Sequence, residues 1–79
     1  MAKGRADLAI SSYHAALHYN PGSAEAHNDL GVAFASGGLS GEAIAEFSEA
    51  LRLDPDNAEY ASNLSAAENL SKNPADMAQ

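Results

Sequence analysis

The sequence predicts an all-α protein of four antiparallel helices, and three observations support that fold class. Apolar residues recur at spacings of three and four in four separate stretches, which is the pattern of an amphipathic helix. Asn-Pro-Gly, Gly-Gly and Asp-Pro turns separate these stretches. A shift of 34 residues aligns residues 4–38 with residues 38–72, and ten of the 35 aligned pairs are identical. A repeat of this length indicates stacked helical hairpins.

The first two helices are predicted over residues 6–19 and 24–36. The Asn-Pro-Gly turn ends the first, because the residue before a proline is pushed out of the α region. Ser23 is then a good N-cap for the second, and Gly37-Gly38 ends it with residues that accept a positive φ. Gly31 costs about 1 kcal/mol of helix propensity, so we expect it to let another helix come close. The predicted apolar faces are Leu8, Ile10, Tyr13, Ala16 and Leu17, then Ala26, Leu30, Ala33 and Phe34.

The third helix is predicted between Ser40, its expected N-cap, and the Asp54-Pro55 turn. Asp56 and Glu59 are predicted to form a capping box for the fourth helix, over residues 58–70. The polar segment that follows contains a proline and is expected to be a frayed tail. The apolar face of the third helix is Ala43, Ile44, Phe47, Ala50 and Leu51.

Length and charge exclude several classes of function. Seventy-nine residues make one small domain at most, and the absence of cysteine excludes zinc fingers, disulfide scaffolds and cysteine nucleophiles. The net charge is −7, and the four basic residues are scattered, so neither nucleic acid nor an anionic membrane is an expected partner. No apolar run approaches the roughly 20 residues that span a bilayer. With no targeting signal in the sequence, a cytoplasmic protein is the default expectation.

The 34-residue helix-turn-helix unit resembles the tetratricopeptide repeat. The small and large residues that this family favours fall within residues 24–57 and are Leu30, Gly31, Phe34, Ala43, Phe47, Ala50 and Pro55. His27 stands where the family often has tryptophan, which weakens the match there. The resemblance extends from about Lys3 to Leu70 and implies a short right-handed solenoid of helical hairpins.

The phase of the repeat suggests a division of the chain. In the terms of the family, residues 1–23 are a half repeat with a B-type helix, and residues 24–57 are one complete repeat. Residues 58–71 are a second half repeat that ends the array, and residues 72–79 are a flexible tail. Glu68 and Ser65 stand where Phe34 and Gly31 stand one repeat earlier, which suits a helix whose outer side faces water.

The resemblance implies a non-enzymatic module that binds a protein or peptide in a concave groove lined by the A-type helices. The expected groove residues are Glu25, Asn28, Val32, Ala35, Ser36, Glu59, Ser62, Ala66, Asn69 and Leu70. One subclass of the family captures the C-terminal carboxylate of chaperones, and only Asn63 here has a suitable side chain for that. Carboxylate capture needs cationic donors, and Glu25 and Glu59 stand where that subclass has lysine. We therefore exclude this ligand.

The first helix is expected to expose part of its apolar face, because the A-type helix that would normally cover it is not in the sequence. Exposed apolar patches commonly mean association. One interpretation is self-association into a homo-oligomer through Leu8, Ile10, Tyr13 and Leu17. The alternative is that the chain is a structural fragment of a longer array attached to an enzyme or assembly, with no binding activity of its own; O-GlcNAc transferases carry repeats of similar style.

The remaining polar patterns have simpler explanations. His14 and His18 have the i, i+4 spacing of a metal pair, but no third ligand stands beside them, so we expect surface histidines and no metal. Glu42, Glu46 and Glu49 form an acidic stripe, and Arg52 is expected to pair with Glu49. A solvent-exposed face explains this stripe, and the alternative is that it binds a basic protein. No nucleophile with an adjacent base and no phosphate loop is present, so neither catalysis nor a cofactor is expected.

Overall fold

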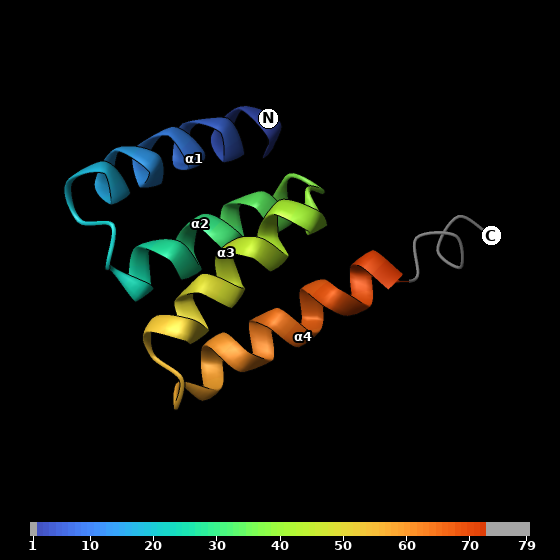
Figure 1. The fold of residues 1–79 in the computed structure, drawn as a ribbon. Helices are drawn as coiled ribbons and strands as arrows, with labels where there is room; N and C mark the ends of the chain where they lie inside the picture. Colours follow the sequence, from blue (N-terminus) through green and yellow to red (C-terminus); the bar gives the residue numbers. More distant parts are fainter. Residues whose placement is uncertain (1, 73–79) are drawn as a thin grey trace.

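Each helix of the chain packs against the next one along the sequence and runs antiparallel to it (Figure 1). The computed structural model describes residues 2–72, with side chains from residue 7 onward. The all-α prediction is confirmed: the helices of the described range are α1 (Ala2–Tyr19), α2 (Ala24–Ser36), α3 (Ser40–Leu53) and α4 (Ala58–Lys72). The α2–α3 hairpin occupies the middle, with α1 on one side and α4 on the other.

The outer ends of the first and last helices lie beyond their predicted limits. Helix α1 begins four residues earlier than expected, at Ala2. The single glycine in that stretch costs about 1 kcal/mol of helix propensity and does not end a helix whose other residues favour it. Helix α4 continues to Lys72, which the sequence assigned to the tail. The rest of the predicted tail, residues 73–79, lies outside the described residues.

Two turns form around α2 as the sequence predicts. The hydroxyl of Ser23 accepts a hydrogen bond from the backbone N–H of Ala26, 3.1 Å away, and so caps the helix. At the other end Gly38 has φ +81°, the left-handed conformation that glycine adopts without strain. The N–H of Leu39 then bonds to the carbonyl of Phe34 at 2.8 Å, which closes a Schellman turn.

The predicted caps of α3 and α4 are wrong. Residue Leu39, not Ser40, occupies the N-cap position of α3, and it makes no side-chain cap, because the Schellman turn leads straight into the helix. The Asp56 capping box is replaced by Asn57. The Asn57 side-chain oxygen accepts from the backbone N–H of Tyr60 at 3.1 Å, and its amide donates to Asp54.

The core lies between α2, α3 and α4. Leu30 on α2 and Ala43 on α3 are fully buried, and Phe47 on α3 lies against Ala67 on α4 in the same cluster. Gly31 faces the Phe47 ring, so the close approach expected at this glycine is present. Gly31, Ala43 and Ala67 have small side chains or none, so the helices can come close together at these residues. The apolar sides of α2 and α4 both face α3.

Candidate functional site

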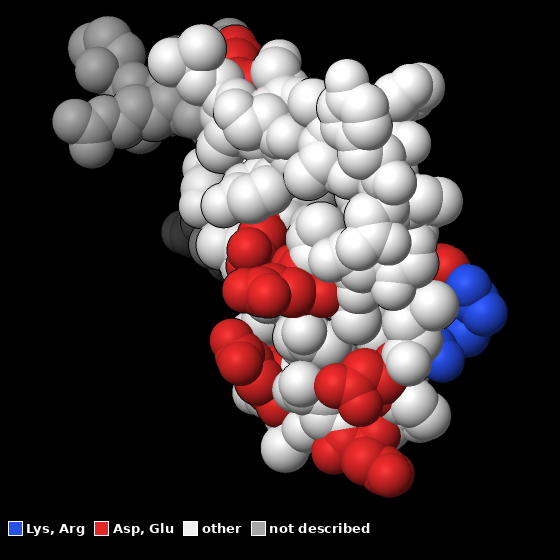
Figure 2. Space-filling model, turned by 90° about the vertical axis from the view of Figure 1, so that its left-hand side faces the viewer, with Lys and Arg blue, Asp and Glu red and all other residues white. Residues whose placement is uncertain are grey.

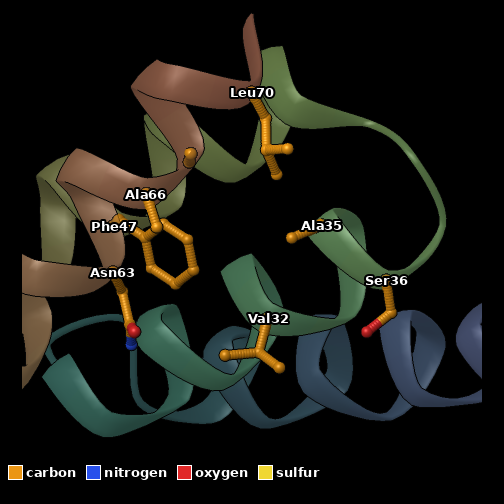
Figure 3. Close-up of a pocket in the computed structure, with 8 residues that line it drawn as sticks. Val32, Ala35, Ser36, Phe47, Asn63, Ala66 and Leu70 are labelled. Atoms are coloured by element: carbon orange, nitrogen blue, oxygen red, sulfur yellow. The ribbon is translucent and has the colours of Figure 1, made fainter. Parts of the chain in front are cut away.

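An open hollow of about 320 Å³ lies between the C-terminal halves of α2 and α4 (Figure 3). Helix α3 contributes its floor through Phe47, which is almost fully buried. Its lining residues are Val32, Ala35 and Ser36 from α2, Phe47 from α3, and Asn63, Ala66, Ala67 and Leu70 from α4. We call this hollow the α2–α4 groove.

The α2–α4 groove is mainly apolar. Val32 and Leu70 are 46% and 45% exposed and stand on opposite sides of the opening, as Figure 3 shows. The polar side chains among the lining residues are Ser36 and Asn63. Apolar walls with a few polar groups are typical of ligand sites. The groove could bury an aliphatic side chain, but its lining contains no charged group that could act in catalysis.

A hydrogen bond between two asparagines ties the walls of the groove together. The side-chain amide of Asn63 on α4 donates to the side-chain oxygen of Asn28 on α2 at 2.8 Å. Asn28 is only 5% exposed, so its oxygen is satisfied by this contact in place of water. The bond sets the spacing of α2 and α4 one turn away from Val32.

The structure brings together about half of the groove residues expected from the sequence. Val32, Ala35, Ser36, Ala66 and Leu70 line the groove. The remaining members do not: Asn28 is buried against Asn63, while Glu25, Glu59, Ser62 and Asn69 are exposed outside the lining.

Sequence reasoning missed three lining residues, Phe47, Asn63 and Ala67. A signal existed for Phe47, because the glycine at Gly31 indicates that a large side chain comes from the facing helix. Asn63 follows Glu59 by four residues and therefore lies on the same face of α4. Phe47 and Asn63 are therefore the two lining residues that the sequence could have indicated.

Four carboxylates act electrostatically on Tyr60, near the N-terminal end of α4. Figure 2 shows Asp and Glu side chains gathered on this end, with the basic atoms in view at one edge. Burial of the ring, and then the negative charges of Asp54, Glu25, Glu59 and Asp29, raise the pKa of Tyr60. The N-terminal halves of α2 and α4 therefore carry a negative potential where their C-terminal halves carry the apolar groove.

The acidic stripe predicted on α3 is largely occupied by partners within the chain. Glu46 contacts Nδ1 of His27 at 2.8 Å, and Nε2 of the same ring lies 3.0 Å from the carbonyl oxygen of Pro21. Glu49 pairs with Arg52 as expected, and the hydrogen bond from Arg52 lowers the pKa of Glu49. A basic partner would therefore meet few unpaired carboxylates on this side.

The outer side of α1 is less covered than the equivalent side of α3. Leu8 is 71% exposed, whereas Ile10, Tyr13 and Leu17 are half-buried; α1 packs on α2. A comparison one repeat later shows the difference: Ala9, Tyr13 and Ala16 are at least partly exposed, while their equivalents Ala43, Phe47 and Ala50 are buried. The expected exposure of apolar surface on α1 is present, chiefly at Leu8.

The two histidines of α1 have separate aromatic neighbours. The His14 ring lies edge-on to Phe34 with centroids 6.2 Å apart, and the His18 ring lies edge-on to Tyr19 at 5.5 Å. Within residues 2–72 no three His, Cys, Asp or Glu side chains gather as metal ligands would. Of the helices described, none has the length and apolar character needed to cross a membrane.

A comparison with protein families gives one match. A family model described as "Tetratricopeptide repeat" matches residues 1–58, well over half of the 79 residues. The matched region contains α1, the α2–α3 hairpin and the first residue of α4. A comparison with curated proteins finds no match.

Proposed function

This chain belongs to the tetratricopeptide repeat family, and from that premise we propose that it is a non-enzymatic module that binds a protein or peptide partner in the α2–α4 groove. Tetratricopeptide repeats are typically non-catalytic and generally bind proteins or peptides. The net charge of −7 favours a protein partner over nucleic acid or an anionic membrane.

The observation that carries the proposal is the apolar groove with its exposed rim. Val32 and Leu70 keep nearly half of their side chains in water although they face each other across a hollow. Burying such a side chain completely is worth about 1.5–3 kcal/mol, so an aliphatic side chain from a partner would gain by entering. The floor and the Asn28–Asn63 bond hold the walls in place before binding, which lowers the entropic cost.

The experiment that tests this function is a peptide selection followed by a matched pair of variants. Peptides selected from a random display library against the whole chain should lose binding to Val32→Glu, because a carboxylate would enter the apolar wall. The control is Ala61→Glu, which adds the same group at an exposed position of α4 outside the groove. Equal binding to both variants would contradict the proposal, and a selection without binders would favour a purely structural part of a longer array.

A second candidate function is self-association through α1. The specific observation is the exposed surface around Leu8, together with the partial exposure of Ala9, Tyr13 and Ala16. Light scattering coupled to gel filtration at high micromolar concentration tests it. We expect a concentration-dependent rise in mass that Leu8→Glu reduces, and a strict monomer would exclude this candidate.

A further inference from the structure

Three carboxylates extend the α2–α4 groove along the same faces of its two walls. On α2, Asp29 follows Glu25 by four residues and Val32 follows Asp29 by three, so the three side chains lie on one face. On α4, Glu59 precedes Asn63 and Ala66 in the same way. A ligand that follows the groove toward the N-terminal ends of α2 and α4 therefore passes from apolar walls to negative charge.

These carboxylates differ from Glu46 and Glu49 on α3, because no ion-pair partner stands beside them among the described residues. Glu46 and Glu49 are engaged by His27 and Arg52. By contrast, Glu25, Asp29 and Glu59 form no ion pair with any residue in the described part of the chain. Their negative charge is therefore available to a ligand from outside.

Tyr60, on the same helix as Glu59, adds a hydrogen-bonding group at this acidic end. Its side chain is 8% exposed, and its hydroxyl has no hydrogen-bond partner among the residues the structure describes. Over the same residues every fully buried side-chain nitrogen or oxygen has a partner, so this hydroxyl must reach solvent. A phenol oxygen in that position can accept a hydrogen bond from a cationic group.

We infer that the ligand of this chain is a basic peptide segment, in which a cationic side chain binds Glu25, Asp29 and Glu59 while a neighbouring aliphatic side chain enters the α2–α4 groove. This inference rests on the groove proposed above as the peptide site, and it adds the chemistry of the partner. The charge of the site and its apolar hollow are complementary to the two ends of such a segment.

The geometry also sets the spacing of the two side chains. Seven residues separate Glu25 from Val32, and seven separate Glu59 from Ala66. At about 1.5 Å per residue, each pair is ~10 Å apart along its helix. An extended peptide covers about 3.3 Å per residue, so its cationic and aliphatic residues should stand about three positions apart.

The test uses short synthetic peptides and the whole chain. The probe contains Arg-Arg-Ser-Leu-Leu, which places each arginine three positions before a leucine. Its comparison peptides replace both arginines by glutamate, both arginines by glutamine, or both leucines by serine. Binding is measured by titration of amide chemical shifts at low and at high salt. We expect the probe to bind most tightly, and to weaken as salt is added.

Two charge-removal variants distinguish this site from general attraction to an acidic protein. The first is Glu25→Gln with Asp29→Asn and Glu59→Gln. The control is Glu42→Gln with Asp56→Asn and Glu68→Gln, which removes the same charge from exposed residues elsewhere, including a first-turn acid of a helix. Exposed ion pairs each contribute only modestly to binding, so we expect the loss of all three charges to weaken binding of the probe about tenfold. Only a small loss is expected with the control.

Each outcome decides one of the two proposals. Equal losses with both charge variants would overturn the inference, because the attraction would then be non-specific. Glutamate and glutamine peptides that bind as tightly as the probe, yet lose binding to Val32→Glu, would overturn the inference and leave the peptide-binding function intact. A probe that binds as tightly without its leucines would show that the groove takes no part, which would also overturn it.

Discussion

The ring of Phe47 occupies the space next to Gly31 so closely that a Cβ at residue 31 would lie 2.6 Å from Cε1 of that ring. A real Cβ does not approach another carbon to that distance, so glycine at residue 31 is a packing requirement of the α2–α3 hairpin. The same contact places Phe47 at the floor of the α2–α4 groove. One close approach therefore supports both the fold and the candidate site.

Gly31→Leu should destabilise the chain by about 1–3 kcal/mol, because overpacking forces the helices apart. Urea unfolding followed by circular dichroism measures the loss. The matched control is Gly41→Leu, since Gly41 lies in α3 and is exposed, with open space around a built Cβ. That variant should be neutral or slightly more stable, because glycine costs about 1 kcal/mol in a helix. Equal stability of the two variants would contradict the packing described for α2 and α3.

Gly38→Ala should destabilise the chain by about 1 kcal/mol. Gly38 has φ +81°, where a side chain is strained even though open space surrounds it. The control is Gly22→Ala, because Gly22 also has open space and does not have a positive φ. Thermal unfolding compares the two. If both variants melt together with the unmodified chain, the left-handed turn before α3 is not present in solution.

Asn63→Ala should cost about 1–3 kcal/mol, because it leaves the buried side-chain oxygen of Asn28 without its partner. The exposed neighbour Ser62→Ala serves as the control. A double-mutant cycle with Asn28→Ala isolates the pairwise contribution, since two residues in contact do not give additive losses. Strictly additive losses would show that the two side chains are not bonded in solution.

Stability should fall at alkaline pH because of Tyr60. Burial and the nearby carboxylates raise its pKa in the folded state, so folding favours the neutral phenol. The stabilisation is fully present below the unfolded pKa of about 10 and is lost as the pH rises through the folded value. Unfolding curves between pH 8 and pH 11 measure this loss. Tyr60→Phe should reduce it, whereas Tyr19→Phe, at a ring that is 86% exposed, should not.

Periodicity was sufficient to predict the helices but not all of their ends. The α2 limits and the Ser23 cap agree with the sequence because strong local signals, a proline turn and a glycine pair, determine them. The predicted cap of α3 was wrong because the Schellman turn leads straight into the helix at Leu39. The predicted cap of α4 was wrong because the neighbouring polar residues Asp56 and Asn57 could each cap the helix, and the turn geometry selects Asn57. That geometry depends on the packing of the hairpin.

The candidate site was predicted in part for a related reason. Helical spacing identifies the face on which Asn28 and Val32 lie, but it cannot show which of them another helix covers. Asn28 is buried by Asn63, 35 residues later in the chain. The floor of the groove comes from Phe47 on α3, a helix that the family resemblance does not place among the ligand contacts. Both facts arise from tertiary packing and not from local pattern.

The proposed function requires that a peptide binds between α2 and α4. The most direct measurement is a map of amide chemical-shift changes as a display-selected peptide is added to the whole chain. The largest changes are predicted at Val32, Ala35, Ala66 and Leu70. Changes concentrated around Leu8 on α1, with those four residues unaffected, would contradict the claim and move the interaction surface to the other side of the molecule.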